Sequence, residues 1–233
     1  FGEVFRRQEH RGPRASEYFQ VGYELFDGTD PAAADAEVFA LFAGTLAPLG
    51  LRAATGDIGI LMAAVRGLST TEARKTRLLH HIWRPRRFRA LLDAYSGRVA
   101  VPEARQKMLA GLAATPVERA LWDQGGVIGL RGEAEIAARA RALLSDAEVP
   151  PLPAAEVEIL AELFALRAPM PEAIGRLQDL AVDLPPLGAA VDRLEARGAA
   201  LAARGIDVEH LDFEANFGRT TLEYYDGFVF GFY

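Results

Sequence analysis

The sequence predicts an α+β fold in which an antiparallel sheet is interrupted by a helical insertion. Strand-like patterns stand at both ends of the chain, whereas residues from about 62 to 205 read almost without a break as helices. Strands and helices seldom alternate, and this order favours an antiparallel sheet over a doubly wound parallel one. Strands at the two ends most simply pair in one sheet. We therefore expect a core of residues 1–61 and 186–233 and a helical insertion of residues 62–185.

The N-terminal part predicts two strands, a helix and a third strand. After "GEVFRR" and the turn-rich "EHRGPRAS", residues 17–27 alternate so that the two faces of one strand carry different chemistry. Asp30 and Pro31 have the form of an N-cap and a first helical position, and apolar residues at helical spacing continue to Gly50. "LRAATGDIGIL", residues 51–61, predicts a short strand.

The middle of the chain predicts a series of helices bounded by Pro, Gly or Asp. The expected helices cover residues 85–97, 102–113, 116–126, 133–146, 153–167, 171–184 and 188–205. The β pattern returns in "VEHLDFEANF" and in the aromatic "GRTTLEYYDGFVFGFY". On that last strand, Phe228, Phe230 and Phe232 share a face that we expect to pack in the core, with Glu223 and Tyr225 on the other face.

Composition and charge limit the kinds of partner and site that the chain can have. The chain has 233 residues, is 50% hydrophobic and carries a formal charge of −6, which argues against nucleic acid or a membrane surface as its main partner. The absence of cysteine excludes disulfides and thiolate metal sites. We expect no signal peptide, no window with the roughly 18 apolar residues of a membrane span, and a cytoplasmic location.

No motif predicts a metal site, a cofactor or a catalytic residue. The four histidines, at positions 10, 80, 81 and 210, have no second ligand at a persuasive spacing. A nucleophile elbow, a P-loop and a dinucleotide fingerprint are also absent from the sequence.

A basic run over residues 72–90 surrounds Trp83. Its cations are Arg74, Lys75, Arg77, Arg84, Arg86, Arg87 and Arg89. These cations could bind phosphate, RNA or an acidic protein surface. The simpler interpretation, which we favour, is a solvated helix pair whose arginine stems cover apolar surface.

Gln20, Gly22 and Glu24 lie on one face of the predicted second strand. An amide and a carboxylate at this spacing project to the same side and could clamp an ammonium group through charge-assisted hydrogen bonds. The alternative is an ordinary exposed polar face of a half-covered sheet.

Two stretches resemble class II aminoacyl-tRNA synthetases of the histidyl branch. "FRRQEHRGPRASEYFQVGYELF" is similar to motif 2 of that family, and "LEYYDGFVF" is similar to its histidine-specific motif. The matching positions are Phe5, Arg6, Arg14, Gln20, Gly22 and Glu24 in the first, and Leu222, Glu223, Tyr224, Tyr225, Gly227, Val229 and Phe230 in the second. The resemblance implies a synthetase-like antiparallel-sheet core.

The resemblance also implies which groups remain. Gln20 and Glu24 would hold a histidine ammonium and Tyr225 its imidazole, with Glu223 and Tyr224 completing the pocket. The former ATP-site positions would be Arg6, Gln8, Arg14 and Arg219.

The departures from the family pattern lie in the reactive part of the site. Gln8 replaces a glutamate that helps to seat adenine, and His10 and Pro13 replace a loop proline and glycine. Thr220 stands where an arginine activates the carboxylate, and Arg219 is shifted by one residue, which on a strand would point it to the other face. The pattern indicates a retained ligand pocket and an eroded adenylation site.

This combination resembles the synthetase paralogues that serve as regulatory subunits of ATP phosphoribosyltransferase in histidine biosynthesis. The resemblance implies no aminoacylation activity, a dimer within a hetero-oligomer with the short catalytic subunit, and a histidine ligand. One alternative is a catalytically competent histidyl-tRNA synthetase with a divergent motif 2. Another is a stand-alone module that binds an amino acid or RNA.

Overall fold

A four-stranded sheet lies at the centre of the computed structural model, which describes residues 1–5, 15–115, 119, 132–219 and 225–233. The strand order is β4-β5-β3-β6. The strands are β3 (Ala53–Asp57), β4 (Arg167–Pro169), β5 (Asp212–Glu214) and β6 (Phe228–Phe232). Strands from the two ends of the chain therefore pair in one sheet, as predicted.

Not every ladder of this sheet is antiparallel. β6 pairs antiparallel with β3, from Ala53 opposite Phe232 to Asp57 opposite Phe228, and β4 pairs antiparallel with β5. β3 and β5 are parallel. The long helical connection between them returns the chain in the same direction, which parallel pairing requires. β4 comes from within residues 62–185, so part of the predicted insertion joins the sheet, and the boundaries of that insertion stay a prediction.

A separate two-stranded hairpin precedes the sheet. β1 (Gly2–Phe5) pairs antiparallel with β2 (Glu17–Gln20), with Gly2 opposite Gln20. The prediction of one strand over residues 17–27 is wrong in its second half, because β2 ends at Gln20. In the described part of the chain no strand pairs with residues 21–27, so alternation alone does not make them part of a sheet.

The first helix follows the predicted signals. α1 (Pro31–Leu46) begins after Asp30, whose side chain accepts a hydrogen bond from the Ala33 amide at 3.0 Å. The short helix η1 (Ala47–Leu49) continues it to Gly50, which has φ +61 and ends the helical run.

The stretch Pro31–Leu49 corrects one expectation. Among the described residues it is long and apolar enough to cross a membrane by length and composition, although a core helix passes the same test. Two of its acidic residues form ion pairs, Asp35 with Arg197 in α10 (Gly188–Ala203) and Glu37 with Arg204 at the C-cap of that helix. Phe39 is buried against the ring of Phe230 at 5.0 Å. We therefore assign α1 to the α+β core.

The predicted third strand is shorter than expected because a helix interrupts it. β3 ends at Asp57, whose Oδ1 accepts a hydrogen bond from the Gly59 amide at 2.7 Å and so caps α2 (Ile58–Gly67). The strand predicted in "VEHLDFEANF" is likewise reduced to the turn η3 (Val208–His210) followed by β5.

The remaining helices confirm the predicted order of the middle of the chain. They are α3 (Glu72–His80), α4 (Pro85–Tyr95), α5 (Glu103–Ala114), α7 (Glu133–Glu148), α8 (Ala154–Ala165), α9 (Met170–Asp183) and α10 (Gly188–Ala203), with the turn η2 (Pro185–Leu187) before α10. The helix predicted over residues 116–126 lies almost wholly outside the described residues.

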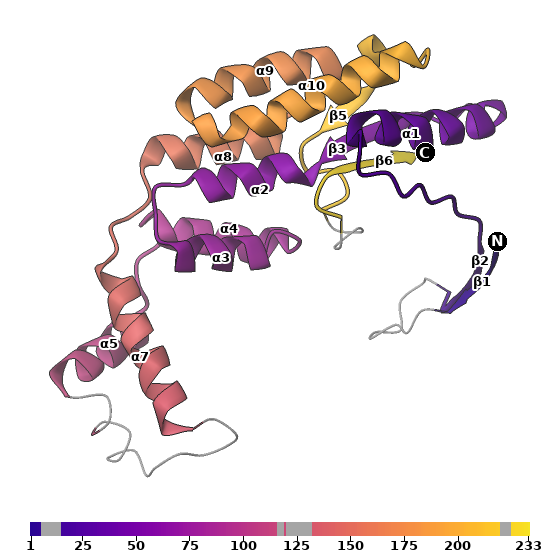
Figure 1. Cartoon of the computed structure of the whole chain (residues 1–233). Coiled ribbons are helices and arrows are strands. Elements are labelled where there is room, and N and C mark those ends of the chain that lie inside the picture. Colours follow the sequence, from indigo (N-terminus) through magenta and orange to yellow (C-terminus); the bar gives the residue numbers. More distant parts are fainter. Residues whose placement is uncertain (6–14, 116–118, 120–131, 220–224) are drawn as a thin grey trace.

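The arrangement of these helices sets where ligands could bind. In Figure 1, α9 and α10 lie together above α8 and α2, with α3 and α4 below, and α5 and α7 project away from this body. One main core cluster runs from α1 through α2 to α10, while among the described residues α5 and α7 share a small cluster at Leu112, Ala137 and Ala140. In Figure 1 the hairpin stands apart from α1 and β6, and the segment that follows it, residues 20–26, lines a groove together with these two elements.

Candidate functional site

A groove of about 600 Å³ lies between residues 20–26, α1 and β6. We call it the hairpin groove. Its described lining residues are Gln20, Val21, Gly22, Tyr23, Glu24, Leu25, Phe26, Asp35, Val38, Phe42, Tyr225, Phe228, Val229 and Phe230. Tyr225, which is far from Gln20 and Glu24 in the sequence, therefore lines the same groove as these two residues.

The walls of the hairpin groove differ in chemistry. Residues 20–26 form one wall, on which Gln20 and Glu24 are exposed. Asp35, Val38 and Phe42 form part of the other wall, because residues three and four apart lie on one face of α1. The sequence predicted α1 from the helical spacing of its apolar residues but did not place it beside Gln20 and Glu24.

Two carboxylates line the hairpin groove, Glu24 and Asp35, and no lysine or arginine is among its described lining residues. Asp35 is paired with Arg197 behind the wall, so Glu24 is the carboxylate that favours a cation. Tyr225, Phe228 and Phe230 add aromatic rings, whose faces attract ammonium and imidazolium groups.

A buried ionic cluster lies behind this wall. Arg197 on α10 donates from Nε to Asp35 Oδ2 at 2.5 Å and from Nη1 to Asp57 Oδ2 at 2.6 Å. Its guanidinium lies 5.6 Å from the centre of the Phe228 ring. Burial raises the pKa of Asp57 above its ordinary value, while Arg197 and the Gly59 amide act in the opposite direction. Arg197 thus joins α1, the end of β3 and α10 around the groove.

The two faces of the last strand do not separate as the sequence predicted. Phe228 and Phe230 line the hairpin groove, so these rings are not confined to a packed face behind the ligand. Phe230 nevertheless also contacts Phe39 and Phe42, with ring centres 5.0 and 6.1 Å apart. The reason is that α1 covers this face of β6 only in part.

Arg219 does not line the hairpin groove. It lies in the turn after β5 rather than on a strand, and only 5% of its surface is exposed. Its guanidinium packs between Phe88 and Phe164 and donates to the carbonyl oxygen of Ile82. Its assignment to a former ATP site stays a prediction, as do those of Arg6, Gln8 and Arg14. The assignment of Glu223 and Tyr224 to the ligand pocket also stays a prediction, and all five of these residues lie outside the described part of the chain.

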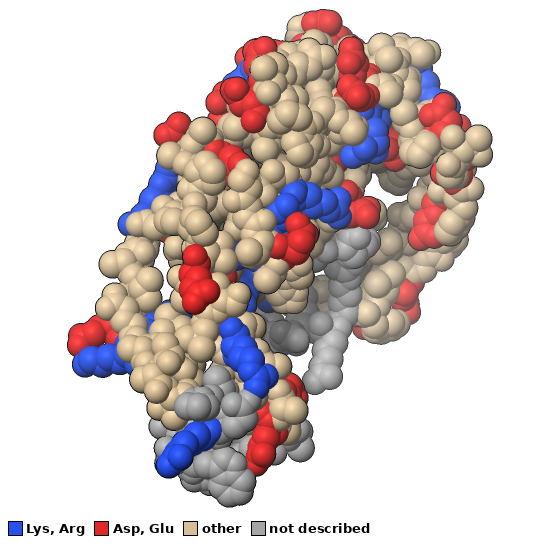
Figure 2. Space-filling model, turned by 60° about the vertical axis from the view of Figure 1, so that its left-hand side comes forward, with Lys and Arg blue, Asp and Glu red and all other residues tan. Residues whose placement is uncertain are grey.

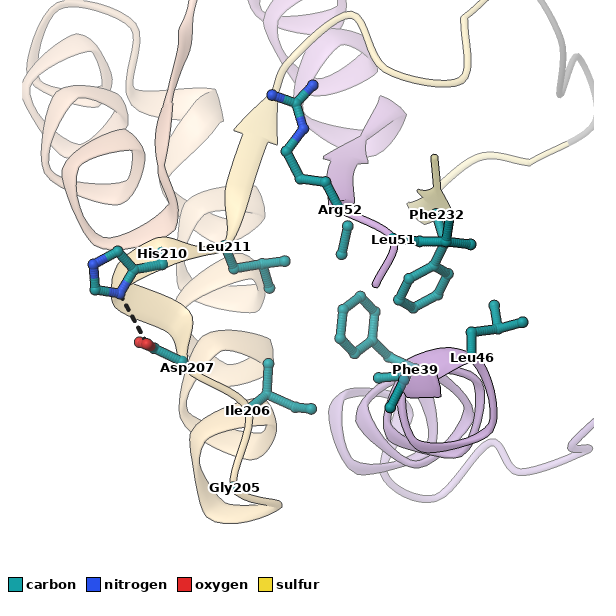
Figure 3. A pocket seen from close by; sticks show the side chains of 13 residues that line it. Phe39, Leu46, Leu51, Arg52, Gly205, Ile206, Asp207, His210, Leu211 and Phe232 are labelled. Atoms are coloured by element: carbon teal, nitrogen blue, oxygen red, sulfur yellow. Dashed lines mark hydrogen bonds and ion pairs between the residues drawn. The ribbon is translucent and has the colours of Figure 1, made fainter. Parts of the chain in front are cut away.

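A second, smaller cavity of about 290 Å³ lies at the other end of α1, between Phe39, Phe232 and the loop before β5. Figure 3 shows apolar side chains facing it, whereas Arg52 and the hydrogen-bonded pair of His210 and Asp207 point away from it. An apolar cavity without an inward polar group offers little to orient a ligand. The hairpin groove is therefore the better candidate site.

The basic run divides between structural and exposed arginines. Arg74 is buried and its Nε donates to Asp146 Oδ1 at 2.8 Å, while Arg77 donates to the Tyr95 hydroxyl at 3.2 Å. On the face shown in Figure 2, basic and acidic side chains are interspersed.

Among the described residues no group of three metal-ligating side chains occurs.

The fold is that of the class II aminoacyl-tRNA synthetase-like proteins. The chain belongs to the histidyl-tRNA synthetase family, whose family model matches residues 1–124. The resemblance found in the sequence is thereby confirmed.

The curated relatives carry the name of a regulatory protein. "ATP phosphoribosyltransferase regulatory subunit" is the name of a protein from Agrobacterium fabrum, 34% identical over 98% of this chain and 63% of its own length. A protein of the same name from Allorhizobium ampelinum is 32% identical over 98% of this chain and 64% of its own length. The chain thus spans somewhat less than two thirds of these relatives.

A solved structure supports the fold. A chain from Bacillus halodurans, described as an ATP phosphoribosyltransferase regulatory subunit/histidyl-tRNA synthetase, superposes with a TM-score of 0.52. It is 20% identical, and the match covers 89% of this chain and 40% of that one. At this identity the match shows the fold alone, which agrees with the predicted synthetase-like α+β class.

Proposed function

We propose that the chain is part of a non-catalytic regulatory subunit of ATP phosphoribosyltransferase, which binds the short catalytic subunit and senses histidine. The observation that carries the proposal is the hairpin groove. It brings together Gln20, Glu24 and Tyr225, whereas Arg219, which is shifted by one residue from the place of the family's activating arginine, lines a different pocket. The names of the relatives point to the same role.

Histidine would bind through its positive groups. Its ammonium would interact with Glu24 and Gln20, and its imidazole would stack near Tyr225 and Phe228, since charge-assisted hydrogen bonds and aromatic faces both favour a cation. Binding without aminoacylation is the role that the relatives' name, a regulatory subunit, favours.

The test has two arms. Histidine should raise the unfolding temperature of the protein in a saturable way, as any ligand of the folded state does, and histidinol and alanine serve as matched comparisons. A short-form ATP phosphoribosyltransferase should then be retained by the immobilised protein and change in activity. Failure to recover a complex, with no change in activity, would contradict the regulatory role.

The second candidate is a catalytically competent histidyl-tRNA synthetase. The match of residues 1–124 to the histidyl-tRNA synthetase family model favours it. Histidine-dependent exchange between ATP and pyrophosphate would establish it and would overturn the proposed loss of adenylation.

A further inference from the structure

Arg219 is a buried cation without a carboxylate partner in the part of the chain that the structure describes. Its Nη1 donates to Asn216 Oδ1 at 3.0 Å, and its Nε donates to a backbone carbonyl oxygen. Its Nη2 is buried and has no hydrogen-bond partner. Burial lowers the pKa of Arg219 to about 10, and the nearby Arg89 acts in the same direction. A buried charge with neutral partners and a like-charged neighbour is costly, so a compensating anion would stabilise it.

A pocket of about 240 Å³ opens at this arginine. Pro85, Phe88, Arg89, Phe164, Asn216 and Arg219 line it. We call it the Arg219 pocket. None of these residues lines the hairpin groove, so the two sites are separate.

The N-terminal end of α4 adds a third source of positive potential. Pro85 is the first residue of this 11-residue helix, and the N-cap residue Arg84 makes no side-chain capping hydrogen bond. No capping oxygen from Arg84 therefore offsets the positive end of the helix dipole, which favours anions.

We propose that the Arg219 pocket binds a small phosphate-type oxyanion between Arg219, Arg89 and the N-terminal end of α4. Guanidinium groups match the geometry of phosphate oxygens, and Phe88 and Phe164 hold the guanidinium of Arg219 at 4.9 and 4.6 Å from their ring centres. Drug-sized ligands occupy roughly 300–1,000 Å³, so a pocket of this size suits an inorganic ion or a single phosphate group. The inference does not rest on the proposed regulatory function.

A purely structural role is the competing interpretation. Arg219 joins the turn after β5 to α4 and α8 through its two aromatic contacts, and such packing stabilises a fold with no ligand. A structural arginine would change the free energy of unfolding when replaced. A protein in which Arg219 is only structural would show no binding of phosphate. Phosphate titration therefore distinguishes the structural role from the binding role.

The experiment titrates the protein with inorganic phosphate at constant ionic strength and follows heat of binding and unfolding temperature. We expect saturable binding at one site and a rise in unfolding temperature. Arg89→Gln should raise the dissociation constant about tenfold, as expected for loss of a charge-assisted contact. Arg86→Gln is the matched control, because Arg86 is exposed on the same helix and does not line the pocket. It should change the dissociation constant less than twofold.

Three results would overturn the proposal. They are no saturable response of the unmodified protein to phosphate, equal weakening by Arg89→Gln and Arg86→Gln, and tighter binding of acetate than of phosphate. Arg219→Gln should abolish phosphate binding. If that variant does not fold, the comparison of Arg89→Gln with Arg86→Gln still tests the proposal. These readouts do not involve histidine or a partner protein, so they are independent of the test of the regulatory function.

Discussion

Arg197 Nη1 lies 2.6 Å from Asp57 Oδ2, and this ion pair connects α10 to the residue that ends β3 and caps α2. The side chains of both residues are at most 10% exposed. The same guanidinium reaches Asp35 at 2.5 Å on the wall of the hairpin groove.

Replacing Arg197 by methionine should destabilise the protein by about 3–5 kcal/mol, because it leaves Asp57 as a buried charge without its partner. Urea unfolding measures this difference. Arg204→Met at the C-cap of the same helix is the matched control, since Arg204 and Glu37 form a more exposed pair and should contribute at most about 1 kcal/mol. Similar losses in the two variants would show that the buried ion pairs of Arg197 contribute no more to stability than the exposed pair of Arg204 and Glu37.

The cost of Arg197→Met should depend on pH. Burial already raises the pKa of Asp57, and removing the opposing charge of Arg197 should raise this pKa further. A carboxyl group whose pKa is raised by folding favours the folded state at low pH, and this contribution is lost as pH rises through the folded-state pKa. The stability difference from the unmodified protein should therefore be smaller near pH 5 than at pH 7.

The double variant Arg197→Met, Asp57→Asn provides the control for that pH dependence. Without a titrating group at position 57, the difference from the unmodified protein should vary less between these pH values. An unchanged dependence would assign the effect to another group.

Glu24→Gln should weaken histidine binding by about 1.5–3 kcal/mol if the bound ligand covers the carboxylate, the value of a hydrogen bond to a charged group. Calorimetry measures the change in affinity. Glu17→Gln in β2 is the matched control, because Glu17 is an exposed glutamate seven residues before Glu24 that does not line the groove. Equal affinities of Glu24→Gln and the unmodified protein would mean that this face does not contact histidine.

Gly56→Ala should destabilise the sheet by about 1–3 kcal/mol through overpacking. A Cβ atom at position 56 would lie 2.7 Å from both the Glu214 carbonyl oxygen and the Phe217 Cβ, where β3 and the chain after β5 approach closely. Gly44→Ala in α1 has open space and should instead stabilise by roughly 0.5–1 kcal/mol. Thermal unfolding of the two variants compares them directly, and a tolerated Gly56→Ala would contradict this packing.

The sequence by itself determined the local elements and the family. Pro, Gly or Asp marks at least one end of most of the helices, because propensity and capping act over a few residues, and the motif with Gln20 and Glu24 identified a synthetase-like chain. The tertiary structure alone decided the parallel pairing of β3 with β5, the wall that α1 gives to the hairpin groove, and the place of Arg219 between α4 and α8. The contact of Arg197 with Asp57 spans 140 residues. Hydrophobic period and capping patterns describe neighbours along the chain, so they carry no information about which distant surfaces meet.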